Sequence, residues 1–240
     1  MDPDVFIFAI LFVIFLGAFT RATLGFGDAL VAMPLLAMFA DMKIATPVVA
    51  FEAVVIATLK LIESWRKVDF RAAWRLILAS IAGIPFGLMM LKSAPEGIVK
   101  SLLGIVLILF GIYNLLKPDL PALKSKPLAY LAGFLAGILG GAYNTNGPPV
   151  IIYGTLSKWS PTRFRATLQC YFVPTAIFIL IGNGVAGLWT PDVLKLFAYS
   201  FPVILLATFL GTKLSYKIPA GVFDRYVYAA LIVMGLLLFI

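Results

Sequence analysis

The feature that most constrains this chain is a succession of long apolar segments. A run of about 20 apolar residues is long enough to cross the hydrocarbon core of a membrane as a helix. Six runs of this kind are expected to span: 44–64, 72–92, 98–116, 166–186, 193–212 and 221–240. Since 62% of the residues are hydrophobic and only 12% are charged, the apolar surface exceeds what a water-soluble domain of this size buries. The sequence therefore predicts an all-α, polytopic membrane protein.

Two further pairs of apolar segments are shorter, and each pair flanks a polar, glycine-rich interruption. The first pair is 5–20 with 28–40, and the second is 128–143 with 148–157. Non-helical backbone at membrane depth persists only where protein or a water-filled cavity covers it. We therefore expect a broken or re-entrant helical hairpin at 5–40 and another at 128–157. Two short hairpins with glycine turns at the surface are the alternative.

Basic residues are concentrated in alternate loops. The clusters lie at 66–75, 117–126, 158–165 and 213–217, whereas the remaining loops are poor in charge or acidic. Because cytoplasmic loops carry an excess of Lys and Arg, an N-terminus on the outside places all four clusters on the cytoplasmic side. This assignment predicts that both termini lie outside. It also attributes the net charge of +8 to the loops, so nucleic-acid binding is not expected.

The two halves of the chain match at spaced positions. Gly87 and Gly111 correspond to Gly211 and Gly235, each 124 residues later, and Gly17 and Gly27 correspond to Gly137 and Gly147, each 120 residues later. Each half holds five apolar segments, so the second half begins on the opposite face and the repeat is inverted. The expected parts are a first repeat (1–117), a cytoplasmic linker (118–127) whose Pro118, Pro121 and Pro127 stop helices, and a second repeat (128–240). Inverted repeats are a common plan of secondary transporters.

Polar residues and glycines in and near the two interruptions are the candidates for substrate binding. They are Arg21, Thr23, Gly25 and Gly27 in the first, Asn144, Thr145, Asn146 and Gly147 in the second, and Arg165 and Gln169 at the start of the next helix. Helices beginning near Asp28 and Pro148 would direct free N–H groups into the breaks, and two such ends would form an anion site. Arginine suits an oxyanion because its planar group offers several donors. Alternatively, Arg21 snorkels to the interface, Arg165 only marks the cytoplasmic side, and the polar side chains tie helices together.

Glu52 lies near the middle of the segment 44–64. A charge at the bilayer centre costs about 2.5–3.5 kcal/mol on insertion scales, so such a residue usually faces a pathway or a partner. A buried carboxylate can also carry a proton. Glu52 and Asp28 are therefore the candidates for coupling transport to an ion gradient. A structural ion pair or hydrogen bond is the alternative for Glu52.

The absence of histidine and the single cysteine, Cys170, exclude several chemistries. A disulfide within one chain, a Cys/His zinc site and a Ser-His-Asp unit all need residues that the chain lacks. We expect no catalytic residue, no metal site and no cofactor, and an enzyme is the least favoured class.

Motifs in both interruptions resemble the sulfite exporter TauE/SafE family. They are Arg21, Gly25-Phe-Gly27 and Met33-Pro34-Leu-Leu in the first half, and Gly147-Pro148-Pro149 and Phe164-Arg165-Ala166-Thr167-Leu168-Gln169 in the second. The resemblance implies a permease of the bacterial inner membrane with two inverted halves, carrying sulfite, sulfonates or related small organic acids with an ion gradient. Many members carry glycine where this chain has Asp28. The difference places a negative charge beside the proposed anion site, which bears on which substrate is carried, unless Asp28 is protonated or serves as a helix cap.

The leading hypothesis is therefore a secondary transporter that moves a small organosulfur or sulfite-type anion by alternating access with ion coupling. A passive anion channel and a permease for small carboxylates are the alternatives. The expected partners are the small anion and the lipid bilayer, and a homodimer is left open. The pattern indicates neither the direction of transport nor whether the coupling ion is a proton or sodium.

Overall fold

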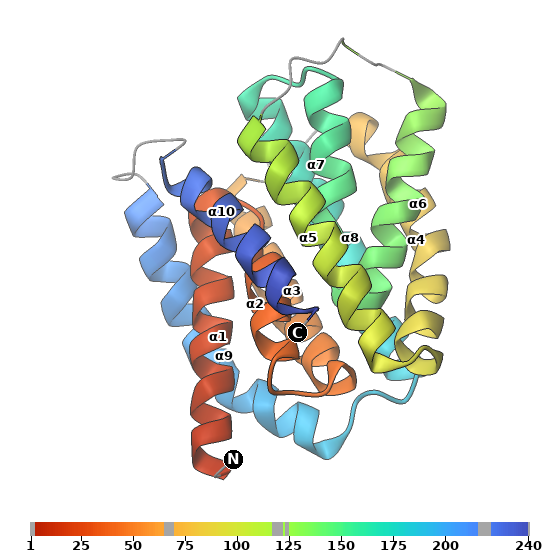
Figure 1. Cartoon of the computed structure of the whole chain (residues 1–240). Helices are drawn as coiled ribbons and strands as arrows, with labels where there is room; N and C mark the ends of the chain where they lie inside the picture. The colour runs from red at the N-terminus through yellow and green to blue at the C-terminus, as the bar shows by residue number, and fades with distance from the viewer. Residues whose placement is uncertain (1–2, 65–69, 117–121, 123–124, 216–221, 240) are drawn as a thin grey trace.

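The structure, a computed structural model, describes residues 3–64, 70–116, 122, 125–215 and 222–239. Within these residues the chain is helical and contains no strand (Figure 1). The helices are α1 (Pro3–Leu24), α2 (Asp28–Ala37), α3 (Met42–Ser64), α4 (Phe70–Ser93), α5 (Glu96–Leu116), α6 (Lys126–Tyr143), α7 (Gly147–Leu156), α8 (Pro161–Val185), α9 (Pro191–Ser215) and α10 (Val222–Leu237). The predicted all-α class is confirmed.

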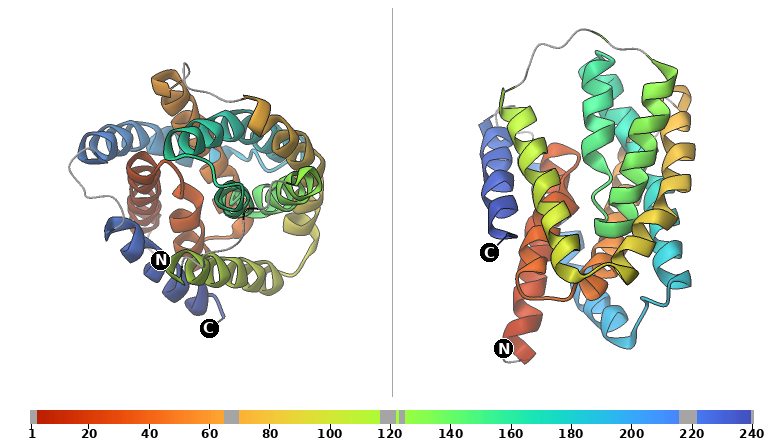
Figure 2. Two further views of the ribbon diagram at one scale, coloured as in Figure 1. Left: turned by 90° about the horizontal axis from the view of Figure 1, so that it is seen from above. Right: turned by 45° about the vertical axis from the view of Figure 1, so that its right-hand side comes forward.

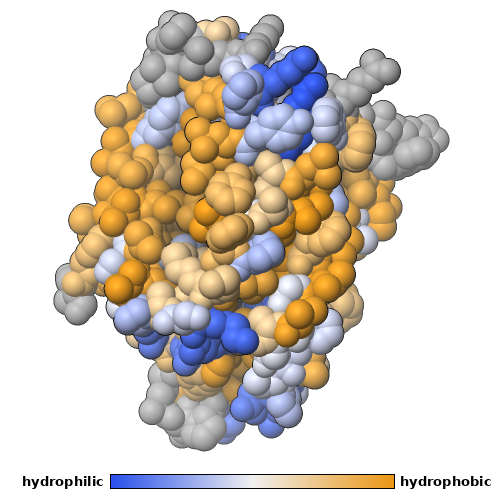
Figure 3. All heavy atoms as spheres, turned by 90° about the vertical axis from the view of Figure 1, so that its right-hand side faces the viewer, coloured by the Kyte–Doolittle hydropathy of each residue, from blue (hydrophilic) through white to orange (hydrophobic). Residues whose placement is uncertain are grey.

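Six of these helices are long and apolar enough to cross a membrane. They contain the segments Asp4–Leu24, Met42–Ile62, Ala73–Ser93, Glu96–Leu116, Thr167–Val185 and Pro191–Ser215. In Figure 3, hydrophobic side chains form a broad band between hydrophilic residues gathered toward the two ends of the molecule. The protein is therefore a multi-pass membrane protein. The described part of α10 has 16 residues and covers about 24 Å, which is less than a full crossing.

The helices pair across the two halves of the chain. α1 packs against α9 on one flank, α4 packs against α6 on the other, and α5 crosses α10 on a third face (Figures 1 and 2). α3 packs against α8, and the short helices α2 and α7 pack against α3 and α8 respectively.

Glycines set the closest approaches between these helices. A Cβ atom on Gly137 of α6 would overlap the carbonyl oxygen of Ser80 on α4, and one on Gly211 of α9 would lie 2.8 Å from the carbonyl oxygen of Phe19 on α1. Because lipid is as apolar as the helix surfaces, membrane helices associate through such close packing of small residues.

The first hairpin differs from the prediction in where α1 ends. α1 continues to Leu24, and the hydroxyl groups of Thr20 and Thr23 donate to the carbonyls of Leu16 and Phe19 within it, both at 2.8 Å. Polar side chains that are satisfied in this way do not interrupt the helix. The turn follows at Gly25 (φ 90°) and Gly27 (φ 102°), in the left-handed region that glycine adopts readily. The sequence had suggested that Arg21 and Thr23 lie in the break. They lie instead in the last turn of α1.

The second hairpin begins earlier than expected. Pro127, which was expected to stop a helix in the linker, lies in the first turn of α6, where no N–H donor is needed. Asn144 ends α6 in the left-handed conformation (φ 55°), and its N–H and that of Thr145 donate to the carbonyls of Gly140 (2.8 Å) and Leu139 (3.2 Å). Most of the linker 118–127, and residues 65–69 and 216–221 in or beside two basic clusters, lie outside the described residues. The two inverted repeats stay a prediction.

Candidate functional site

Side-chain hydrogen bonds join the first break to α8 and the second break to α3 and α8. In the first break, the carbonyl of Gly25 accepts a hydrogen bond from Gln169 Nε2 at 2.9 Å. In the second, Asn144 Nδ2 donates to the carbonyl of Val49 at 3.0 Å, and Asn146 Nδ2 donates to Thr175 Oγ1 at 3.1 Å. Since α3 and α8 pack against each other, these bonds bring the two breaks to the same region of the interior.

A buried ion pair closes the first break. Arg21 Nη1 at the end of α1 lies 2.5 Å from Asp28 Oδ2 at the start of α2, and the two residues are 2% and 7% exposed. Asp28 is well placed because a helix N-terminus favours negative charge. The guanidinium also lies over the ring of Phe172, 4.8 Å from its centroid, which is a cation–π contact. Arg21 is therefore held inside the protein rather than at the membrane interface.

Several buried polar atoms around this pair make no hydrogen bond to any described residue. They are Nε and Nη2 of Arg21, Oε1 of Gln169, and both carboxylate oxygens of Glu52. Buried polar groups usually have partners, and an unmade bond costs about 1–3 kcal/mol. The donors of Arg21 are thus the atoms best able to take up a negatively charged ligand.

Glu52 approaches the ion pair at a glycine of α1. A Cβ atom on Gly17 would lie 3.2 Å from Glu52 Oε1 and 2.9 Å from the carbonyl oxygen of Asp28. Glu52 is fully buried and lies within electrostatic range of Asp28 and Arg21. With all three groups ionised the cluster carries a net charge of −1, and with Glu52 protonated it is neutral. The protonation of Glu52 therefore decides whether an added anion meets repulsion.

The side chains of other predicted residues bond to groups of the protein itself. The hydroxyl of Thr23 donates to Phe19 and lies 3.5 Å from the carbonyl oxygen of Gly211 on α9, so it faces away from the ion pair. The hydroxyl of Thr145 donates to the carbonyl of Tyr143 at 3.0 Å. The amide donors of Asn144 and Asn146 are taken by α3 and α8, as described above. The side chain of Arg165 lies outside the described part of the chain.

The two helix starts are unequal as anion sites. In α2 the first intrahelical bond runs from the N–H of Val31 to the carbonyl of Gly27 at 3.1 Å, so the first turn presents three N–H groups. α7 begins with Gly147, Pro148 and Pro149, and the two prolines have no N–H to offer. The start of α2 is therefore the stronger donor, although the sequence had suggested two comparable ends.

Two residues of this region were missed from the sequence. Phe172 lies three residues after Gln169, on the same face of α8, and that spacing could have indicated it. Gly17 was noticed only as a repeat marker, because nothing in the sequence shows that Glu52 would lie against it.

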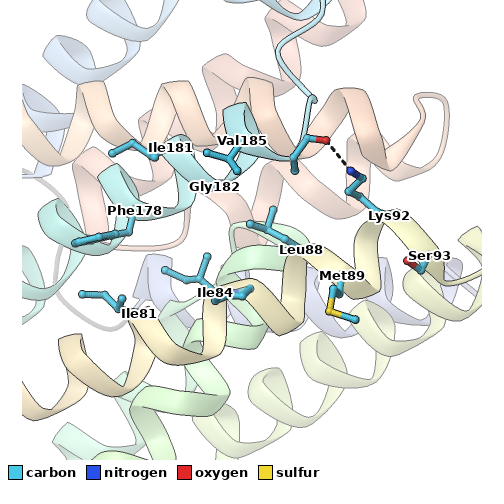
Figure 4. Close-up of a pocket in the computed structure, with 12 residues that line it drawn as sticks. Ile81, Ile84, Leu88, Met89, Lys92, Ser93, Phe178, Ile181, Gly182 and Val185 are labelled. Carbon is cyan, nitrogen blue, oxygen red and sulfur yellow. Dashed lines mark hydrogen bonds between the residues drawn. The ribbon is translucent and has the colours of Figure 1, made fainter.

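An apolar groove lies elsewhere, between α4 and α8 (Figure 4). It has a volume of about 540 Å³ and is lined by residues such as Ile84, Leu88 and Phe178. Lys92, at one end of the groove, donates to the carbonyl of Ala186 at 2.8 Å. None of the candidate site residues lines this groove, so it is separate from the buried ion pair.

Comparisons with known proteins agree with the sequence motifs. The family model described as sulfite exporter TauE/SafE matches residues 10–238. A curated protein of Cupriavidus necator, named probable sulfite/organosulfonate exporter TauE, is 23% identical over an alignment of 225 positions that covers 91% of this chain and 88% of that protein. No solved structure gives a significant match.

Proposed function

The chain belongs to the sulfite exporter TauE/SafE family, and from that premise we propose that it carries sulfite or a small organosulfonate across the bacterial inner membrane. The name of the Cupriavidus necator relative supports this substrate class and supports export as the direction. The transporter class also agrees with the six helices that are long enough to span. Enzymatic chemistry is not part of the proposal.

Arg21 is the proposed anchor of the anion, and its free guanidinium donors are the observation that carries the proposal. Nη1 is occupied by Asp28, whereas Nε and Nη2 are buried without a described partner. These two donors lie on one edge of the planar group and match two oxygens of a sulfite or sulfonate group. The first turn of α2 adds N–H donors and its positive dipole end.

Glu52 is the proposed coupling residue, and Asp28 contributes to coupling by neutralising the charge of Arg21. Asp28 already neutralises Arg21, so a singly charged anion entering beside an ionised Glu52 would change the net charge of the cluster from −1 to −2. Like charges that lie close together in a low-dielectric interior repel strongly. The anion should therefore bind together with a proton on Glu52, which predicts movement of both in the same direction. The net direction then follows the combined gradients, so export requires an outward gradient of the anion that outweighs any inward gradient of the proton.

Helix packing supports the inverted repeats, which are a common basis of alternating access. Exchanging the halves pairs α1 with α6 and α4 with α9, so the α1–α9 contact becomes the α6–α4 contact, and both are present. A Cβ atom on Gly111 would meet the Tyr228 carbonyl and Ile232, and one on Gly235 would meet the Gly104 carbonyl and Ile108. Subtracting 124 from 228 and 232 gives 104 and 108. The contacts of the two glycines are thus equivalent under the repeat.

Burial of the site supports a carrier over a channel. Arg21, Asp28, Glu52 and Gln169 are all less than 10% exposed, so a ligand reaches them only after helices move. A continuous pore would leave its lining residues wet.

Flux into proteoliposomes tests the proposal. Purified protein should move sulfite and ethanesulfonate at rates that saturate with concentration and that rise when an inward proton gradient is imposed. Liposomes without protein and liposomes with Arg21→Gln/Asp28→Asn are the controls. Indifference to sulfite, sulfonates and carboxylates alike would reject the transport proposal. Non-saturating electrical currents would favour a channel instead.

A further inference from the structure

A second apolar groove lies between α5 and α7, with α6 as its floor. Its volume is about 430 Å³, and its lining includes Leu109 and Tyr113 of α5 and Pro148, Ile152 and Leu156 of α7. Tyr113 and Leu156 lie near the ends that the charge pattern assigns to the cytoplasm. Pro148 lies at the other end of the groove, beside the second break. The groove therefore runs from the cytoplasmic ends of these helices to the start of α7, beside the second break.

The equivalent face in the first half of the chain is covered. With the offset of 120 residues, Ile152 and Leu156 of α7 correspond to Ala32 and Leu36 of α2. Leu36 is 1% exposed and Ala32 is fully buried, whereas Ile152 and Leu156 are only partly buried. The comparison of Leu36 with Leu156 involves the same side chain, so residue size does not explain the difference.

The difference arises from where the α5–α10 pair rests. α5 and α10 both pack against α2, whereas α7 packs chiefly against α6 and α8. In two repeats related by symmetry, α2 and α7 are equivalent helices, and the pair could pack against either one. We call these two packing surfaces its seats, and only the seat on α2 is occupied.

The α5–α10 pair is built to move as one body. Gly104 and Gly235 face each other so closely that a Cβ atom on either would lie within 2.8 Å of the other's carbonyl oxygen. The ring of Phe110 on α5 also packs edge-on against Tyr228 of α10, with centroids 6.0 Å apart. Because an interface packed this closely resists deformation, α5 and α10 are expected to keep their mutual arrangement when they move.

We propose that the α5–α10 pair is the gate of this transporter, resting on α2 in the present conformation and moving onto α7 in the alternate one. The move closes the groove on the cytoplasmic side of the second break and uncovers α2 on the outer side of the first. The proposal rests on the proposed alternating access, and it names the moving element and its two seats.

Matched cysteine variants test the gate. In a Cys170→Ser background, Leu156→Cys and Leu36→Cys place one thiol on each seat. In the resting protein a small maleimide should label Leu156→Cys at least ten-fold faster than Leu36→Cys. Sulfoacetate with a proton gradient should slow the first reaction and speed the second. Equal labelling of both seats, or rates that do not change while transport proceeds, would overturn the gate.

A cross-link separates the gate from the choice of substrate. Leu109→Cys/Ile152→Cys joins α5 to α7 across the groove, and each single cysteine is a control. Oxidation should link the pair in the alternate conformation and stop flux until a reductant is added. A sulfonate is the substrate here, because sulfite itself cleaves disulfides. Protein that links on oxidation but moves no sulfur anion even in the reduced state would reject the proposed substrate and support the gate. Protein that transports but never links, or transports fully when linked, would reject the gate.

Discussion

Replacement of Arg21 tests how the buried ion pair serves binding. Arg21→Gln alone leaves Asp28 as an unpaired buried charge, and loss of one partner of such a pair costs about 3–5 kcal/mol of stability. Arg21→Gln/Asp28→Asn removes both charges and should keep the protein folded. Both variants lose the two free guanidinium donors, each worth about 1.5–3 kcal/mol to a charged acceptor. The sum of about 3–6 kcal/mol predicts a Kd for the anion that is roughly 10²- to 10⁴-fold higher.

Asp28→Asn should have the opposite effect and strengthen binding of the anion. It removes the internal anion that competes for Arg21, so the substrate becomes the counter-ion of the guanidinium. Ethanesulfonate should therefore raise the thermal unfolding midpoint of Asp28→Asn in detergent by more than it raises that of the unmodified protein. Titration calorimetry on the same samples gives Kd. Folded Arg21→Gln/Asp28→Asn with an unchanged Kd would refute the anchoring role of Arg21.

Three further substitutions test neighbouring parts of the account. Glu52→Gln should move the anion at a rate independent of the proton gradient in liposomes, and uphill proton-driven transport by this variant would reject Glu52 as the coupling residue. Phe172→Leu removes the cation–π contact with Arg21, and such a contact is worth about 2 kcal/mol when desolvated. The Kd for the anion, measured by calorimetry, should therefore rise by up to about 30-fold. An unchanged Kd would show that the ring does not position the guanidinium. Gly137→Ala should cost about 1–3 kcal/mol by overpacking against Ser80 and lower the unfolding midpoint, whereas Gly97→Ala, with nothing within 4 Å of the added methyl, is the neutral control.

The positions of the helices could be predicted because lipid imposes a simple rule on sequence. Any segment that crosses the bilayer must be apolar and must satisfy its own backbone groups. The interruptions near Gly25 and Asn144 were visible for the same reason, since glycine and polar residues stand out in an apolar chain. The predicted end of α1 was wrong, since the hydroxyl groups of its threonines bond to carbonyls of the same helix instead of interrupting it. The sequence shows a polar atom but not its hydrogen-bond partner.

The candidate site could be predicted only in part. Arg21 and Glu52 stand out as charges within apolar segments, but their proximity depends on how α1, α2 and α3 pack, which no local pattern encodes. Asn144 and Asn146 were expected to bind substrate, and the structure shows their amide donors bound to α3 and α8. An amide side chain in a break serves either role, and only the position of its neighbours decides which.

The most direct test of the central claim is the position of a heavy-atom substrate analogue. Crystals of the protein soaked with 2-bromoethanesulfonate would locate the bromine by anomalous scattering. The account predicts one peak between the two breaks, with the sulfonate oxygens within hydrogen-bond distance of Arg21 Nε and Nη2. A peak only in the groove between α4 and α8 or between α5 and α7, with Arg21 bound to Asp28 alone, would contradict it.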